Sequence, residues 1–477
     1  MMLDVLITNA LIMTMDPTRR VLQNSFLAVE GDKITDIGSM KKLVKAEAKK
    51  IIDAKGKLVM PGLINVHSHG AAILLRGGLS QDRSLYDWML NVLYPGIQTY
   101  TFDDFEIGVR LFVDEAIRSG ITTIVDNEGA ESREKQRVML DVYKKSGMRT
   151  IYGRMFNDLP PPLSLADYYK ILEAKSPKVD HVDDYFVEDT QVVLNSIENL
   201  IKEYNSEGNL IQIWPSPHGP AWCSKEGLIG SLEIAQRCNT RLTIHLSETS
   251  VEFRPFGVST TEYLDSIKFL NPRLLAAHCV WVNDRDIRLL KQNDVKVAHQ
   301  PTSNMYLASG IAPIPKILAQ GITVGLGSDD GNCNDSVNIL NEIRAASLIH
   351  KANMVDASCV TAEQATEMAT IEGAKALGME KSIGSLEIGK KADIIILDLN
   401  APHLRPMHHL PSVLAYQARG TEVETVIVNG RILMENHKLT WMSEDDESKL
   451  LEQAQASSAA IKGRADLELP DRYLIED

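Results

Sequence analysis

The stretch LINVHSH, residues 63–69, is a short apolar run that ends in two histidines separated by one residue. Such a run favours a buried strand, and alternation along a strand turns His67 and His69 toward the same face. Seven further β-type runs follow it: GITTIVDN (120–127), RTIYGRMF (149–156), LIQIWPSPH (210–218), RLTIHLSE (241–248), LLAAHCV (274–280), VKVAHQP (295–301) and ITVGLGSDD (322–330). Amphipathic helical patterns separate them, so the order predicts eight parallel βα units. The expected fold class is α/β, a (β/α)8 TIM barrel.

Two of the helical patterns are well marked. DFEIGVRLFVDEAIRSG covers residues 104–120, and TAEQATEMATIEGAKALG covers 361–378. Thr361 and Gln364 have the spacing of a capping box at the start of the second pattern, and Gly378 suits its end. The sequence therefore predicts one helix over 361–378.

The segments that flank the barrel have β character at both ends of the chain. Residues 1–60 and 385–440 contain strand-like pieces split by turn residues, with VNG at 428–430 as a hairpin signal. We expect the two segments to form one small β-sandwich module, with the metal-dependent barrel at 61–384 and a charged helical tail at 441–477.

Composition narrows the class of protein. The 477 residues are 44% hydrophobic and 24% charged, close to globular averages. The net charge of −14 argues against a nucleic-acid or anionic membrane partner, and no apolar run reaches the roughly 20 residues that a spanning helix needs. The N-terminus lacks the basic region of a signal peptide. The five cysteines form no CxxC pair, which is typical of a reducing compartment, so we expect a cytoplasmic protein.

Polar side chains with metal-binding capacity fall at four strand ends, where barrel enzymes keep their active sites. They are His67 and His69, His245 followed by Glu248, His278, and Asp329. One such residue alone would suit a buried, hydrogen-bonded histidine or a capping aspartate, but all of them at one rim predict a metal centre. Histidines with one aspartate suit Zn²⁺ first and Fe²⁺ second. The run 210–218 offers no lysine for a bridging ligand, so we expect one divalent metal per chain.

These motifs resemble the amidohydrolase superfamily. The resemblance rests on PGLINVHSH, HLSE, AHCV, GLGSDDG and the closing GSLEIGKKADIIILDL, and covers essentially the whole chain. PTSNMYLASGIAPIP and HLSET are similar to the aminohydrolase branch, which includes S-adenosylhomocysteine, guanine and triazine hydrolases. A closer similarity, in LRGGLSQDRSLYDW and DDGNCNDSVNIL, is to the type formed by melamine deaminase and atrazine chlorohydrolase.

The resemblance implies a role for each strand-end residue. It implies that His67, His69, His245 and Asp329 bind the metal. His278 would orient the attacking hydroxide or act as a fifth ligand. Glu248 would protonate the ring nitrogen beside the attacked carbon, and Asp329 would accept the proton from water.

The substrate is predicted from positions at which the melamine and atrazine enzymes differ. Leu85, Leu93, Asp126, Asp330 and Cys333 all match the deaminase. The resemblance therefore implies a mononuclear aminohydrolase that releases ammonia from a melamine-like amino-triazine. A scaffold without activity is the alternative from another class.

Three residues depart from the triazine type. His218, His299 and Pro301 are similar to the residues of purine and nucleoside deaminases. A guanine or S-adenosylhomocysteine/methylthioadenosine deaminase therefore stays open, as does a chlorotriazine dechlorinase.

The sequence predicts further residues of the substrate pocket, and alternative roles stay open for them. Trp88 and Leu85 would form an apolar wall or belong to the core of their loop. Asn304 would bind a ring substituent or fix its own turn. Asp330 would help the amine leave or cap a loop, and Cys333 would line the pocket rather than attack, because no partner for a nucleophile accompanies it. We expect a small N-heterocyclic substrate and a homo-oligomer.

Overall fold

The computed structural model describes residues 2–43, 47–129, 132–160, 187–205, 208, 210–253 and 255–469. All eight predicted β runs form strands. Their bounds are β6 (Leu63–His69), β7 (Ile121–Glu128), β8 (Arg149–Phe156), β9 (Ile211–Pro217), β10 (Leu242–Leu246), β11 (Leu274–His278), β12 (Lys296–His299) and β13 (Val324–Leu326). With the short β14 (Asp329–Asp330) they make two parallel sheets, ordered β14-β6-β7-β8-β9 and β10-β11-β12-β13. The fold is therefore α/β with parallel sheets, as predicted.

The two parallel sheets lie side by side at both of their edges. β9 is in contact with β10, and β13 is in contact with β6. Gly325 permits the second approach, because a Cβ at this position would lie 2.9 Å from Val66 Cγ1. All eight strands thus end on one rim, which carries the polar residues.

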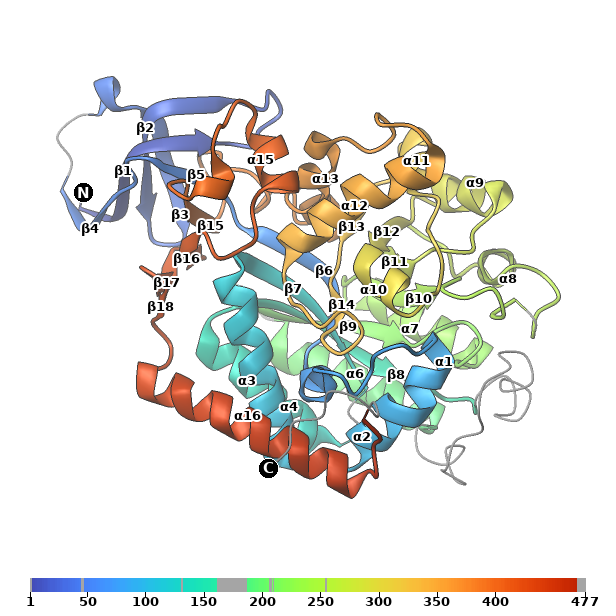
Figure 1. Cartoon of the computed structure of the whole chain (residues 1–477). Coiled ribbons are helices and arrows are strands. Elements are labelled where there is room, and N and C mark those ends of the chain that lie inside the picture. Colours follow the sequence, from blue (N-terminus) through green and yellow to red (C-terminus); the bar gives the residue numbers. More distant parts are fainter. Residues whose placement is uncertain are drawn as a thin grey trace.

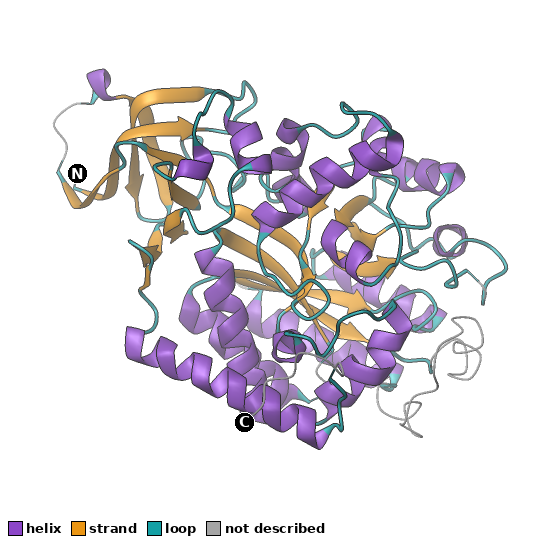
Figure 2. Ribbon diagram, viewed as in Figure 1, coloured by secondary structure: helices purple, strands orange, loops and turns teal. Residues whose placement is uncertain are grey.

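Helices surround the two sheets, as Figure 2 shows. The first group is η2 (Ala71–Leu75), α1 (Leu85–Trp88), η3 (Met89–Leu93), α2 (Tyr94–Gln98), α3 (Phe102–Arg118), α4 (Arg133–Ser146), α6 (Thr190–Tyr204) and α7 (Lys225–Arg237). The second is α8 (Thr260–Ser266), α9 (Asp284–Gln292), α10 (Pro301–Tyr306), α11 (Ile314–Ala319), α12 (Ile339–Met354), α13 (Ala362–Met368) and α14 (Ile371–Ala376). No described helix is long and apolar enough to span a membrane.

The helix predicted over 361–378 is two helices, α13 and α14. Its capping box is present, with Thr361 accepting from the Gln364 amide. The break follows Met368 because the Ala369 carbonyl accepts a hydrogen bond of 2.9 Å from the Ile64 amide of β6. That bond draws the backbone out of the helical pattern and onto the sheet.

The two ends of the chain share a third sheet, shown in Figure 1 as blue and red strands that meet. Its members are β1 (Leu3–Met13), β2 (Val21–Glu30), β3 (Lys33–Ser39), β4 (Ala48–Asp53), β5 (Lys57–Pro61), β15 (Ile394–Asp398), β16 (Val423–Val428), β17 (Arg431–Glu435) and β18 (Lys438–Leu439). β5 pairs with β15, which joins the N-terminal to the C-terminal segment. The described strands form one nine-stranded sheet, and the VNG hairpin joins β16 to β17.

Four further helical segments are described in the N- and C-terminal parts of the chain. They are η1 (Met40–Lys42), η5 (Pro402–Leu404), α15 (Leu410–Tyr416) and the tail helix α16 (Glu444–Arg464). α16 packs along α3 (Figure 1), where Arg464 pairs with Asp104 at 2.6 Å. The charged tail is thus helical, as predicted.

Candidate active site

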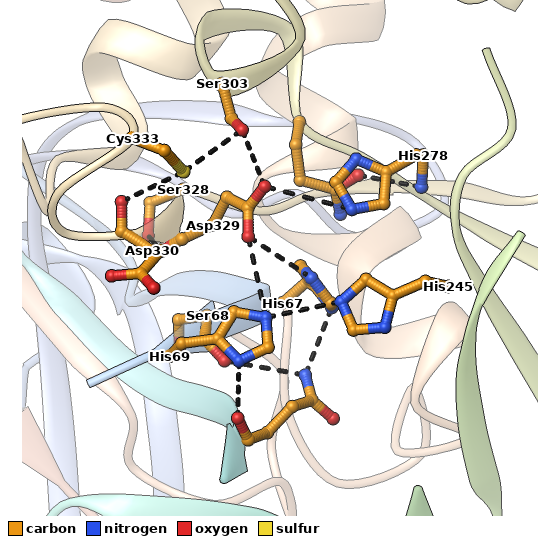
Figure 3. Close-up of polar contacts among 12 residues, drawn as sticks. His67, Ser68, His69, His245, His278, Ser303, Ser328, Asp329, Asp330 and Cys333 are labelled. Carbon is orange, nitrogen blue, oxygen red and sulfur yellow. Dashed lines mark hydrogen bonds and ion pairs between the residues drawn. The ribbon is translucent and has the colours of Figure 1, made fainter. Parts of the chain in front are cut away.

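The strand-end histidines and Asp329 converge on one small volume. Ligand atoms of His67, His69 and His245 lie within 4.8 Å of one another, and so do those of His67, His278 and Asp329. Asp329 Oδ1 lies 3.4 Å from His67 Nε2 and 3.6 Å from His69 Nε2. His245 Nε2 lies 3.3 Å from His69 Nε2. β6, β10, β11 and β14 therefore bring together all the residues that the sequence assigned to a metal (Figure 3).

Hydrogen bonds on the outer side fix the orientation of three of the imidazoles. In each, Nδ1 donates to an oxygen that can only accept: His69 to Asn127 O, His245 to His218 O, and His278 to Asn304 Oδ1. Each Nε2 then carries a lone pair that points inward. This is the pattern of histidines that bind a metal.

Two of the inward atoms test whether a cation fits. His67 Nε2 and His278 Nε2 are buried and have no hydrogen-bond partner among the described residues. Buried polar atoms without a partner are rare and costly. A cation beside these nitrogens would satisfy them, so the donor set fits a divalent metal.

The buried surroundings of three of these imidazoles favour their neutral form. Burial lowers the pKa of His67, His69 and His245, and that of His69 falls to about 3. Neutral imidazole is the form that binds a metal.

The two carboxyl groups of the centre are pushed in opposite directions. Burial and then the charge of Asp329 raise the pKa of Glu248 well above its usual value. Burial acts the same way on Asp329, but the contact with His67 at 3.4 Å and the nearby imidazoles hold its pKa well below the usual range. The surroundings therefore favour a protonated Glu248 beside an ionised Asp329, a difference that typically separates acid from base.

Two residues of the centre have an unusual backbone. His278 and Asp329 have φ values of 70° and 65°, in the left-handed region that side chains other than glycine rarely adopt. Such strain persists where surrounding structure enforces it and is concentrated at functional sites. The Gln300 side-chain oxygen accepts a hydrogen bond of 2.9 Å from the backbone amide of His278.

The sequence reasoning missed Ser303, although it lies in the quoted motif PTSN. Its hydroxyl donates to Asp329 Oδ2 at 2.6 Å and lies 3.2 Å from Cys333 Sγ. Figure 3 shows Ser303 and Cys333 on one side of Asp329 and His67 on the other. Cys333 thus reaches the centre through Ser303. Burial raises the pKa of its thiol well above the usual value, which disfavours the thiolate form that a nucleophile needs.

The predicted pocket residues divide into two groups. A chamber of about 460 Å³ lies against the metal-capable residues and is lined by Leu85, Trp88, Leu93, His218 and Asp330, together with Glu248. The remaining three are not among its lining residues: Asp126, Cys333 and Asn304.

Each residue of the second group supports the chamber from behind. Asp126 is fully buried and accepts from the Gly70 amide at 2.6 Å and the Tyr143 hydroxyl at 2.5 Å. Asn304 Oδ1 accepts from His278 Nδ1 at 3.0 Å, a contact that neither interpretation of the sequence named, and its contact with a ring substituent stays a prediction. The purine-type His299 is buried against His350, with 3.0 Å between their Nε2 atoms.

A second hollow of about 700 Å³ continues from the chamber. The two share His69, Leu93, Tyr94, Met155, His218 and Asp330 as lining residues. Beyond them the second hollow reaches Phe105, Glu128 and Glu188. Glu128 was also missed, although it ends the same β7 run as Asp126 and belongs to the same rim.

Comparison with known proteins places this centre in a family. Residues 58–433 match the model of the amidohydrolase family. The chain belongs to the amidohydrolase family. It is 36% identical to a 5'-deoxyadenosine deaminase of Methanosarcina acetivorans over 97% of this chain and 100% of that protein. It is also 36% identical to an S-triazine hydrolase of Gordonia rubripertincta over 98% of each.

Solved structures agree with the fold of this amidohydrolase. A zinc-bound adenosine deaminase from Xanthomonas campestris superposes with a TM-score of 0.86 at 25% identity, over 97% of this chain and 99% of that one. An atrazine chlorohydrolase from Arthrobacter aurescens TC1 gives a TM-score of 0.83 at 24% identity, over 96% and 99%, a likeness of fold. The amidohydrolase is thus a hydrolase acting on C–N bonds, from a metal-dependent family that includes deaminases, as predicted.

Proposed function

We propose that this amidohydrolase hydrolytically deaminates an amino-substituted N-heteroaromatic ring and releases ammonia. The observation that carries the proposal is the pair of oppositely shifted carboxyls, Glu248 and Asp329, beside converging imidazole Nε2 atoms. His67, His69, His245 and Asp329 would hold one divalent cation, with zinc as the first candidate and Fe²⁺ as the second. When bound, such a cation supplies Lewis-acid activation of water near neutral pH.

The protein groups account for the proton transfers. Asp329 takes a proton from the water that attacks the amino-bearing carbon, and Glu248 gives its proton to the adjacent ring nitrogen. His278 Nε2 lies 3.7 Å from Glu248 Oε2 and 3.8 Å from Asp329 Oδ2, between donor and acceptor. The proton held by Asp329 then passes to the amine, the C–N bond breaks and ammonia leaves, while the added hydroxyl becomes a carbonyl and its proton returns to Glu248.

The chamber supports a flat apolar ring as substrate. Leu85, Trp88 and Leu93 are among its lining residues, and such apolar side chains suit an aromatic heterocycle. Burial and then the charge of Asp329 raise the pKa of Asp330 and favour its protonated form, which would donate a hydrogen bond to the departing amine while Asp329 supplies the proton. Chloride needs no proton to leave, so this feature favours deamination over dechlorination.

The second hollow bears on the size of the substrate. A single triazine such as melamine would occupy the chamber and leave the hollow beyond Leu93 and Met155 without substrate contacts. A 6-aminopurine nucleoside would extend into it. We therefore propose a nucleoside of the 5'-deoxyadenosine or methylthioadenosine kind first and a melamine-like triazine second. Three residues that match melamine deaminase, Leu85, Leu93 and Asp330, support the triazine.

The wider organisation follows the same proposal. Contacts of β9 with β10 and of β13 with β6 support one closed barrel within residues 61–384. The flanking segments would form the β-sandwich module. Unpaired cysteines and the family resemblance support a cytoplasmic homo-oligomer.

An ammonia-release screen of metal-loaded protein tests the function. 5'-Deoxyadenosine, methylthioadenosine, guanine and melamine would be assayed side by side, with chloride release from atrazine in parallel. Activity on at least one amine, lost in Glu248→Gln while bound metal is retained, is the expected result. Chloride release without ammonia release would favour the dechlorinase, and protein unable to take up a metal would favour the scaffold.

A further inference from the structure

The second hollow is lined by acidic and apolar side chains. Its described lining includes the carboxyl groups of Glu128, Glu188 and Asp330 beside apolar side chains such as Phe105 and Met155. No lysine or arginine is among the described residues that line it. A substrate that extends from the metal centre into this hollow therefore meets acidic side chains.

The three acids differ in what compensates them. Glu188 is paired with the Arg154 guanidinium at 2.5 Å. Arg154 is 1% exposed and also donates to the Met155 carbonyl, so its charge is taken up behind the wall. Asp330 belongs equally to the catalytic chamber.

Glu128, like Asp330, forms no ion pair among the described residues, and unlike Asp330 it does not line the chamber. It is 7% exposed, and its Oε1 accepts a hydrogen bond of 2.8 Å from the Ala71 amide. Burial and the neighbouring charge of Asp126 raise its pKa well above the usual value and so favour its protonated form when the hollow is empty. A cation or hydrogen-bond donor beside Glu128 would favour the ionised carboxylate that pairs with it, whereas a second carboxylate would gain no such pairing.

We propose that Glu128 selects the substrate by charge, accepting a hydrogen-bond donor or a cation in the part of the hollow outside the chamber and disfavouring a carboxylate there. The inference rests on the proposed deaminase function. It separates two kinds of nucleoside that share one reacting ring. 5'-Deoxyadenosine and methylthioadenosine have neutral 5' groups, whereas S-adenosylhomocysteine ends in an amino acid with a carboxylate.

Three nearly isosteric substrates test the proposal. 5'-Amino-5'-deoxyadenosine, 5'-deoxyadenosine and adenosine 5'-carboxylate carry an ammonium, a methyl and a carboxylate group at one position. At pH 7.5 we expect kcat/KM for ammonia release to fall in that order, by at least about tenfold from the ammonium to the carboxylate. The difference should lie mainly in KM, because the 5' group is remote from the reacting carbon.

A substitution tests whether Glu128 is responsible for the selection by charge. Glu128→Gln keeps the side-chain shape and removes the ionisable group, and should reduce the ammonium-to-carboxylate ratio of kcat/KM at least about fivefold. Glu106→Gln on α3 is the matched control, since its half-exposed carboxyl makes the same charge change outside both hollows. A ratio unchanged in Glu128→Gln, or moved equally by Glu106→Gln, would overturn the assignment.

Different experimental results would refute the two proposals. Equal use of all three substrates by the wild-type protein would overturn charge selection and leave the deaminase function standing, even if Glu128→Gln did not fold. Ammonia release from none of these nucleosides and from none of the other amines would remove the deaminase function and this inference with it.

Discussion

Replacing Ser303 by alanine should loosen the metal centre without touching a metal-binding residue. The Ser303 hydroxyl donates to Asp329 Oδ2 at 2.6 Å, while the other carboxylate oxygen faces His67 and His69. This bond sets the plane of the carboxylate, and so the direction of Oδ1. We classify Ser303 as a positioning residue.

The size of the effect follows from burial. Ser303 is fully buried and Asp329 is 5% exposed, so water cannot replace the lost donor. A hydrogen bond to an ionised group contributes about 1.5–3 kcal/mol, which corresponds to about 10- to 150-fold in an equilibrium constant. Outer partners of metal-binding residues typically account for about 10- to 100-fold in metal affinity. We therefore expect Ser303→Ala to weaken metal binding by about 10- to 100-fold.

The assay is competition for Zn²⁺ between metal-free protein and a chromophoric chelator, with kcat/KM for ammonia release at saturating metal as the second measurement. Ser231→Ala is the matched control, because Ser231 is fully buried on α7 and its hydroxyl has no hydrogen-bond partner among the described residues. The control should keep wild-type affinity. Zinc affinity and kcat/KM of Ser303→Ala both within twofold of wild type would refute the positioning role.

Three further predictions concern catalysis and stability. Glu248→Gln should lower kcat by at least about 100-fold, since general acid catalysis contributes about 10²–10⁴-fold, while metal content measured by atomic absorption stays the same; an active variant would contradict the assignment. Asp393→Asn should lower the free energy of unfolding in urea by about 3–5 kcal/mol, because Arg149 is buried and donates two bonds of 2.9 Å to that carboxylate; a loss below 1 kcal/mol would argue against it. Burial raises the pKa of Glu342 from 4.5 to about 7, so its stabilisation is complete below about pH 4.5 and is lost as the pH rises through 7, by about 3 kcal/mol in all. Between pH 5 and 7.5 the metal-free wild type should lose stability relative to Glu342→Gln, and parallel profiles would contradict this.

The sequence determined the elements that local patterns encode. Each of the eight β runs is a strand, because short apolar runs with strand-forming residues have few other ways to bury their side chains. Boundaries that depend on distant partners were less predictable. The helix expected at 361–378 breaks where the amide of Ile64, some 300 residues earlier, donates a hydrogen bond to the Ala369 carbonyl.

The metal-capable residues were predictable for a related reason. Parallel strands end on one rim, so residues at strand ends such as His67, His245 and Asp329 meet whatever the intervening chain does. The sequence by itself therefore determined the fold class, the candidate centre and the kind of chemistry.

Only the tertiary structure decided which of the predicted pocket residues line the chamber and which do not. Asp126, Asn304 and Cys333 share their loops and strands with lining residues, yet each points into packed protein and acts through a neighbour. A strand end at Glu128 and a motif at Ser303 were the local signals, but they do not reveal the contacts of these residues, which come from elements far apart in the chain. Burial and charge at such positions depend on how the strands and helices pack. The choice of substrate therefore had to be read from the pocket, whereas the reaction class could be read from the chain.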